Sequence, residues 1–104
     1  MNYRVVFSPE AEDQLAELFR HIASATSPAT ATRYTDAVIS YCEGLRDSPL
    51  RGTRRDDVRP GLRITNYKKR TVIAFDVAGD IVTIIGILYG GQDYESRLDD
   101  AGDG

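Results

Sequence analysis

The sequence has almost none of the residues that build disulfides or metal sites. Its single cysteine, Cys42, has no partner for an internal disulfide, which fits a reducing compartment. Its single histidine, His21, stands on a different predicted helix from Cys42, without the ligand spacing that zinc requires. We therefore predict no metal site and no cofactor. We interpret Cys42 as a small core residue and His21 as a surface or boundary residue, rather than as catalysts.

Long hydrophobic runs are also absent. The longest, residues 84–89, contains Gly86 and is too short to span a bilayer. The opening residues, MNYRVVFSPEAE, have neither a long apolar core nor a cleavage site, so they do not predict a signal peptide. With 41% hydrophobic and 28% charged residues, the composition is that of a soluble globular protein, which we expect to be cytoplasmic. We predict one domain at residues 1–98 and a polar, disordered tail at residues 99–104.

The chain has no net positive charge, because its formal net charge is -3, but its cations are concentrated in one segment. Residues 46–70 hold nine of the 13 arginines and lysines and only three of the 16 acids. An acidic protein with one basic segment is not a general nucleic-acid binder, yet it can carry a focused anion-binding surface. On charge alone, a solvated loop with arginines for solubility is the slightly better explanation.

Two stretches have the pattern of amphipathic helices. Each begins with a serine that can cap free backbone amides, followed by a proline suited to the first helical position, at residues 8–9 and 27–28. Apolar residues then recur at steps of three and four, which predicts helices that end near Ala25 and Arg46. The connector is short, so the helices should form an antiparallel hairpin that needs the strands to cover its apolar side.

The remaining apolar stretches predict strands. β-Branched and aromatic residues mark strands at residues 3–7, 62–65, 70–77 and 81–89, with a polar loop at 50–57 and turns at 66–69 and 78–80. After Gly90 and Gly91 end the last strand, residues 93–98 are expected to form a helical turn. The fold class is therefore α+β in the order β-α-α-β-β-β, with a helical hairpin packed on a small, mainly antiparallel sheet.

Both helices are expected to pack on one face of the sheet, so the other face should be largely exposed. Strict alternation along the last two strands places five apolar residues on that face: Val72, Ala74, Val82, Ile84 and Leu88. An apolar patch of this size on a small protein indicates a partner.

A group of cations gives the sharper chemical signal. Arg63 alternates out of a strand, and the adjacent turn holds Lys68, Lys69 and Arg70 beside Tyr67. Cations with an aromatic ring can grip phosphate and stack a base, or bind a carboxylate-rich peptide. The same residues could cleave RNA without a metal, by stabilising the charged intermediate and moving protons. The residues alone leave binding and cleavage open.

At this point the sequence resembles a known family. The order of elements, the strands GLRI and KKRTVIAFDV, and above all the ending ILYGGQDYESRL are similar to the RelE/ParE superfamily of bacterial toxins, ParE-like branch. The resemblance covers nearly the whole chain. It implies a toxin neutralised by an antitoxin encoded beside it, ParD-like or of another kind, whose C-terminal segment wraps the helices and sheet.

The resemblance implies one of two activities. RelE-like members cut messenger RNA on the ribosome, whereas ParE-like members poison DNA gyrase. Arg63 stands where the family commonly has its strand arginine, and Tyr89 where a histidine or tyrosine is usual. Gly86 and Gln92 replace arginines that are frequent in relatives, and Gly86 stands at the nucleases' second arginine, so the nuclease set is incomplete.

We therefore predict a toxin of a type II toxin-antitoxin module that inhibits gyrase by binding rather than by chemistry. The predicted target-facing residues are Arg59, Arg63, Lys68, Lys69, Arg70 and Tyr89, with the end of the chain as a further contact. The predicted antitoxin-facing residues are those of the apolar patch. The alternatives are a metal-independent, ribosome-dependent mRNA endonuclease that uses Arg63, Lys68 and Tyr89, or a protein that has lost toxicity and only binds its antitoxin.

Overall fold

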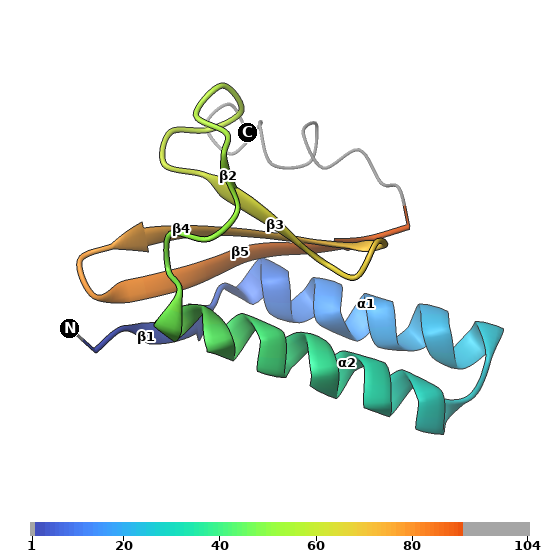
Figure 1. The fold of residues 1–104 in the computed structure, drawn as a ribbon. Coiled ribbons are helices and arrows are strands. Elements are labelled where there is room, and N and C mark those ends of the chain that lie inside the picture. Colours follow the sequence, from blue (N-terminus) through green and yellow to red (C-terminus); the bar gives the residue numbers. More distant parts are fainter. Residues whose placement is uncertain (1, 91–104) are drawn as a thin grey trace.

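The computed structural model describes residues 2–90, which form two helices packed on one face of a five-stranded sheet (Figure 1). The helical turn predicted at residues 93–98 and the polar tail predicted at 99–104 lie outside the described residues. The elements are β1 (Arg4–Phe7), α1 (Pro9–Ala25), α2 (Pro28–Glu43), the short 3-10 helix η1 (Gly44–Asp47), β2 (Thr53–Arg54), β3 (Arg63–Tyr67), β4 (Thr71–Ala78) and β5 (Ile81–Tyr89).

The strand order across the sheet is β1-β5-β4-β3-β2. β1 runs parallel to β5 and the other neighbours are antiparallel, so the predicted α+β class with a mainly antiparallel sheet is confirmed. One strand was missed: β2 lies inside the predicted polar loop and pairs with β3 through only two residues. Pairing this short depends on the neighbouring strand rather than on the local sequence, so it leaves no pattern of its own.

Both helices begin where the serine and proline pairs predict. The Ser8 and Ser27 side chains accept hydrogen bonds from the backbone N–H of the third residue of α1 and α2, at 3.0 and 3.1 Å, and a proline takes the first helical position of each. α2 ends at Glu43 and is followed directly by the 3-10 helix η1. The helical end predicted near Arg46 therefore lies within η1. No helix in the described part of the chain is long and apolar enough to cross a membrane.

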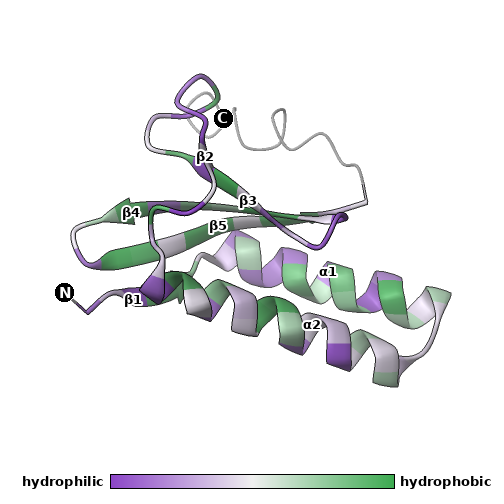
Figure 2. Cartoon of the chain, viewed as in Figure 1, coloured by the Kyte–Doolittle hydropathy of each residue, from purple (hydrophilic) through white to green (hydrophobic). Residues whose placement is uncertain are grey.

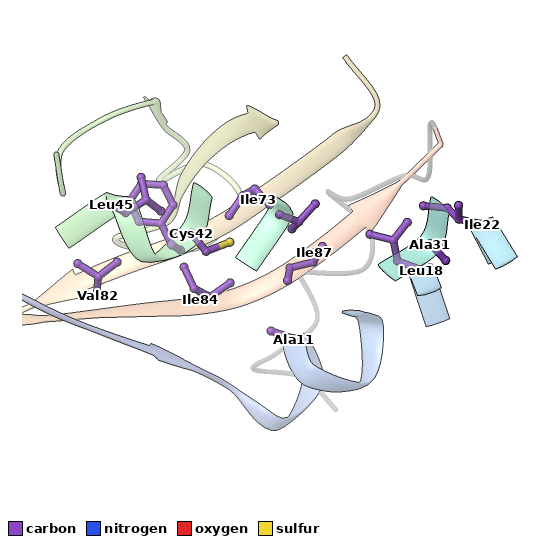
Figure 3. Packing of buried hydrophobic residues seen from close by; sticks show 12 residues of the cluster. Ala11, Leu18, Ile22, Ala31, Cys42, Leu45, Ile73, Val82, Ile84 and Ile87 are labelled. Carbon is purple, nitrogen blue, oxygen red and sulfur yellow. The ribbon is translucent and has the colours of Figure 1, made fainter. Parts of the chain in front are cut away.

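The main core lies between the helices and the sheet (Figure 3). Figure 2 shows that β4 and β5 are largely hydrophobic along their length and that hydrophobic and polar residues alternate along both helices. Phe75 of β4 is fully buried at its centre, with Val38 and Cys42 of α2. The helical stripe predicted from the spacing is confirmed by the burial of Ala11, Leu18 and Ile22 on α1. This core holds the helical hairpin rigidly against the sheet.

Cys42 is expected to be unreactive in the folded protein. Burial raises the pKa of its thiol to about 12, because the low-dielectric core disfavours the thiolate, and the neighbouring Glu43 adds to the shift. At pH 8, iodoacetamide should label Cys42 only after the protein is unfolded in denaturant. Fast labelling under native conditions, at the rate of the denatured protein, would contradict this burial.

A second, smaller cluster fills the face of the sheet opposite the helices. Its buried members are Leu62, Ile64, Ala74, Ile85 and Leu88, with Val58 and Val72 packed against them. Val58 comes from the loop between β2 and β3, which rises on this side of the sheet (Figure 1). The chain therefore supplies part of the cover that we expected a partner to supply.

The predicted membership of the exposed apolar patch is wrong. Val82 and Ile84 are buried under the helices, and Ala74 and Leu88, which do lie on the other face, are only 0% and 2% exposed. The cause is a β-bulge: Phe75 pairs with Ile84 but Ala74 pairs with Gly86, so that Ile85 is an extra residue. Each such extra residue reverses the alternation of faces beyond it.

The bulge is tied to the start of α1. The backbone N–H of Ser8 donates to the carbonyl of Ile84 at 2.9 Å, and the Ser8 hydroxyl donates to the carbonyl of Ile85 at 3.2 Å. Beyond this point β1 has ended, and the side chain of Gln14 takes its place by accepting the N–H of Ile87 at 2.8 Å. Helix α1 therefore lies along β5 up to the end of the strand, where the candidate site begins.

Candidate functional site

Three of the predicted cations form an exposed turn at one end of the sheet. Lys68, Lys69 and Arg70 connect β3 to β4, and all three side chains are exposed. Lys68 has a φ of 56°, which makes it the one non-glycine residue of positive φ in residues 2–90. Its ammonium nitrogen lies 5.8 Å from the centre of the Tyr67 ring, within reach of a cation-π interaction. We call residues 68–70 the cationic turn.

Replacing Lys68 with glycine is expected to stabilise the protein. A side chain in the left-handed region costs roughly 1–2 kcal/mol, and losing the exposed contact with Tyr67 costs about 0.5–1 kcal/mol, so the net gain should be about 0.5–1 kcal/mol. Urea unfolding measures it. Lys69→Gly is the matched control, since Lys69 has no positive φ, and it should be neutral or destabilising. Equal effects of both substitutions would show that the turn stores no strain at Lys68.

Beside the cationic turn, aromatic rings form a continuous row. Ring centroids are 5.4 Å apart for His21 and Tyr89, 6.1 Å for Tyr89 and Tyr34, 5.7 Å for Tyr34 and Tyr67, and 5.4 Å for Tyr67 and Tyr41. The four tyrosines are half-buried and His21 is exposed. The row, which we call the aromatic row, crosses from α1 over the end of the sheet to α2. Its edge-on and tilted geometries are those that aromatic pairs prefer.

Hydrogen bonds to buried or half-buried threonines fix two rings of the aromatic row. The hydroxyl of Tyr34 lies 2.6 Å from that of Thr71, and the hydroxyl of Tyr41 lies 2.9 Å from that of Thr65. Burial raises the pKa of Tyr34 above its ordinary value, against the lowering effect of the bond to Thr71. Tyr34 is therefore a neutral, rigidly placed ring, suited to contact rather than to acid–base work.

Arg63 does not belong to this site. Its guanidinium donates to the backbone carbonyls of Leu50 and Arg51, the latter at 3.2 Å, so it fastens the loop ahead of β2. Arg63 pairs with Phe75 of β4, and Tyr89 pairs with Thr71 of the same strand. Arg63 and Tyr89 are therefore four residues apart along the sheet, or roughly 13 Å. The structure therefore does not bring Arg63 together with Lys68 and Tyr89.

Arg59 is also remote from the cationic turn. It is half-buried in the loop between β2 and β3, at the opposite end of β3. Its backbone closes that loop, since its N–H donates to the carbonyl of Arg55 at 3.2 Å and its carbonyl accepts from Leu62 at 3.0 Å. Of the six residues predicted to face the target, Lys68, Lys69, Arg70 and Tyr89 are gathered at one end of the sheet.

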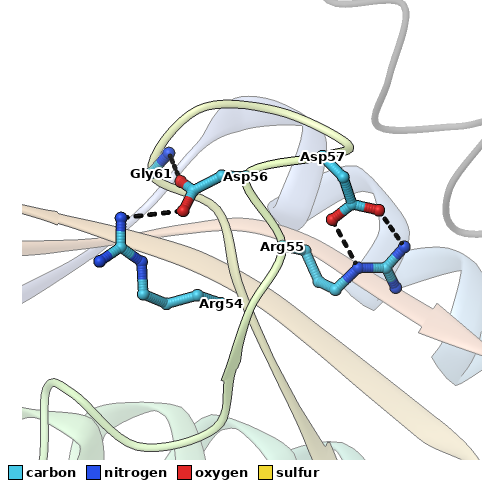
Figure 4. Close-up of polar contacts among 5 residues, drawn as sticks. All are labelled: Arg54, Arg55, Asp56, Asp57 and Gly61. Atoms are coloured by element: carbon cyan, nitrogen blue, oxygen red, sulfur yellow. Dashed lines mark hydrogen bonds and ion pairs between the residues drawn. The ribbon is translucent and has the colours of Figure 1, made fainter.

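Two further arginines of the basic segment, at the end of β2 and at the start of the same loop, are paired with acids of that loop (Figure 4). Arg54 lies 2.8 Å from Asp56, and Arg55 binds Asp57 through two hydrogen bonds of 2.9 and 2.8 Å. The bonds from Arg55 hold the pKa of Asp57 below its ordinary value. The charge of the basic segment is thus partly neutralised near β2, whereas the three consecutive cations of the cationic turn are exposed.

A pocket of about 210 Å³ lies at the other end of the aromatic row, between α1 and the end of β5. His21 and Tyr89 line it, so the structure gives His21 a place that the sequence analysis did not. The signal available in the sequence was spacing, because pocket residues 14, 17, 18 and 21 recur at three and four and share one face of α1. Within residues 2–90, no three histidine, cysteine or acidic side chains form a group that could hold a metal ion.

Together, these elements form a surface suited to binding. Rigid aromatic rings lie beside three exposed cations and beside the small pocket that His21 and Tyr89 line. This arrangement can bind an anionic partner at the cationic turn.

Comparisons with known proteins agree with the fold. The sequence matches the family described as "ParE toxin of type II toxin-antitoxin system, parDE" over residues 5–94. No protein of curated function matches the sequence.

The solved structures that match this chain include the following two. A chain of the chromosomal ParDE system from P. aeruginosa superposes with a TM-score of 0.74 and 18% identity, covering 84% of this chain and 95% of that one. A chain of the toxin–antitoxin complex RelBE2 from Mycobacterium tuberculosis has a TM-score of 0.63 and 19% identity, covering 86% and 100%.

The family match spans most of the chain, including every helix and nearly all of the sheet described above. The chain therefore belongs to the ParE toxin family and is a type II toxin–antitoxin toxin of the RelE/ParE superfamily.

Proposed function

We propose that this toxin inhibits DNA gyrase in the cytoplasm by binding it through the cationic turn and the aromatic row. The observation that most directly supports binding over cleavage is the separation of Arg63 from Lys68 and Tyr89. Metal-independent cleavage of RNA needs cations and proton donors positioned within about 3 Å of the reacting atoms. Here Arg63 is bound to backbone carbonyls four residues along the sheet from Tyr89.

Gly86 supports the same choice. It is buried at the bulge, opposite Ala74, and it has no side chain to donate charge to a leaving phosphate. Gly86 directly follows Ile85, the extra residue of the bulge, and glycine within a strand often marks such a place. Without a complete nuclease site, the rigid side chains of this surface are suited to binding a partner. Rigid side chains lose less entropy when they bind.

A cognate antitoxin is the second proposed partner. Both structural neighbours come from toxin–antitoxin systems, and their fold is the fold of this chain. The antitoxin would neutralise the toxin by covering the surface that binds gyrase.

Controlled expression in bacteria, paired with assays on purified protein, tests the proposal. We expect filamentation with DNA-damage signalling, and we expect the purified toxin to block supercoiling of plasmid DNA by gyrase. Rapid loss of messenger RNA, with cuts inside translated codons, would overturn the proposal in favour of the endonuclease. Normal growth with tight antitoxin binding would instead show that toxicity has been lost.

A further inference from the structure

The pocket between α1 and β5 combines three kinds of surface. Its floor is apolar, because Leu18 and Ile87 are buried there. One wall is aromatic, formed by His21 and Tyr89, whose ring centroids lie 5.4 Å apart. Glu17 brings an exposed carboxylate to the lining.

The pocket is held in shape by the hydrogen bonds of α1 to β5. The side-chain oxygen of Gln14, another lining residue, accepts the N–H of Ile87 at 2.8 Å and so fixes both residues. Ser8 fastens the start of the same helix to the bulge. A pocket on two such elements is preformed, which lowers the entropic cost of filling it.

The side of the pocket formed by α1 is acidic. Helix α1 exposes four acids (Glu10, Glu12, Asp13 and Glu17) and one cation, Arg20. The cationic turn adjoins the other side of the pocket, because the N–H of Gly90 donates to the carbonyl of Arg70 at 3.0 Å. A cationic group in the pocket would therefore meet its favourable charge at the carboxylate of Glu17, on the α1 side.

We propose that this pocket binds an arginine side chain of the antitoxin, an inference that rests on the antitoxin partner proposed above. The methylene groups of an arginine would pack on Leu18 and Ile87, while the guanidinium would lie against the Tyr89 ring and pair with the carboxylate of Glu17. Arginine fits better than lysine, because its planar group can stack on a ring and bind a carboxylate with two hydrogen bonds at once.

This position also explains how binding would neutralise the toxin. Tyr89 belongs both to the pocket and to the aromatic row, and its cross-strand partner Thr71 follows directly after the cationic turn. An antitoxin segment anchored in the pocket would therefore continue over the row and shield it from gyrase. Arginine is among the residues that most often anchor protein interfaces.

The first test is the affinity of the antitoxin encoded beside the toxin, measured by calorimetry with toxin variants. Glu17→Gln should weaken binding about tenfold and Glu17→Lys about a hundredfold, because each leaves the guanidinium without its carboxylate. Glu12→Gln, an exposed acid of the same helix outside the pocket lining, is the matched control and should bind as the unchanged toxin does. Toxicity in the absence of antitoxin should be unchanged in all three variants.

The arginine itself can be found by replacing each antitoxin arginine with methionine. One replacement should weaken binding to the unchanged toxin but have little further effect on Glu17→Gln, as expected for two residues that contact each other. If no arginine shows this coupling, or if Glu12→Gln and Glu17→Gln weaken binding equally, the pocket assignment is wrong.

The second test does not depend on the antitoxin. N-acetyl-arginine N-methylamide, titrated into the toxin and followed by NMR, should give saturable shifts at Leu18 and Ile87, and the citrulline analogue should give none. Shifts that appear only in an Arg97→Ala variant would assign the pocket to the chain's own Arg97 instead. Absent or equal shifts for both ligands would overturn the proposal even if the toxin proves to inhibit gyrase.

Discussion

Replacing Gly52 with alanine is expected to lower the free energy of unfolding by about 3 kcal/mol or more. Gly52 has a φ of 85°, in the left-handed region, where a side chain costs roughly 1–2 kcal/mol. In addition, a Cβ at this position would press into the carbonyl oxygen of Ile64 and lie 3.2 Å from the Cβ of Thr65. Relieving this contact would require the backbones of two paired strands to separate, at a further cost of about 1–3 kcal/mol.

Gly61→Ala separates the two causes. Gly61 has a similar φ of 80°, but a Cβ there would meet no atom within 4 Å, so only the conformational cost of about 1–2 kcal/mol applies. Urea unfolding of both variants measures the difference. Equal losses would show that the close approach of Gly52 to β3 contributes nothing to stability.

The loss at Gly52 should extend to the neighbouring loop. Residue 52 lies between Arg51, whose carbonyl accepts from Arg63, and β2, whose pairing with β3 includes only two residues. Hydrogen exchange should therefore become faster in β2 and the loop that follows, while β4 and β5 remain protected. This pattern would confirm that Arg63 and Gly52 together hold the loop on the sheet.

Reversing the charge of the cationic turn is expected to abolish toxicity. Lys68, Lys69 and Arg70 are exposed beside the aromatic row, so their replacement by glutamate would present three like charges to an anionic target. Like-charge contacts cost several kcal/mol at an interface, and a loss of at least about a hundredfold in gyrase inhibition should follow. Supercoiling assays with purified toxin measure it.

The control variant has the same net charge as the charge-reversed variant, but its substitutions lie elsewhere on the surface. Arg4, Arg46 and Arg54 are exposed on β1, η1 and β2, at the end of the sheet opposite the cationic turn, and their joint replacement by glutamate changes the net charge by the same amount. This variant should retain most of its inhibition at physiological salt, since exposed charges beyond about 8 Å are largely screened. If both triple variants lose activity equally, overall charge rather than the cationic turn decides binding.

Arg63 shows how far a sequence can indicate a site. Its place in an alternating strand and its match to the family predict a target-facing side chain. The structure assigns it to loop carbonyls instead, because β2 and its loop return to β3 at the residue where Arg63 emerges. A side chain that alternates out of a strand can be bound by any segment that lies over it, and the sequence does not show which one does.

The features that the sequence determined by itself are local. Ser8 and Ser27 with their prolines mark the starts of both helices, and Gly79 marks the turn between β4 and β5. These depend on contacts within a few residues, so the local pattern suffices to predict them. The cationic turn is also local, because its three cations are consecutive.

Only the tertiary structure decided which residues meet. The bulge at Ile85 reverses the faces of β5, so that Val82 and Ile84 enter the main core and Ile87 lines the pocket. His21 and Tyr89, 68 positions apart, form one wall of that pocket. A register shift of one residue costs little locally but changes every long-range contact beyond it, which explains why periodicity predicted the elements but not the site.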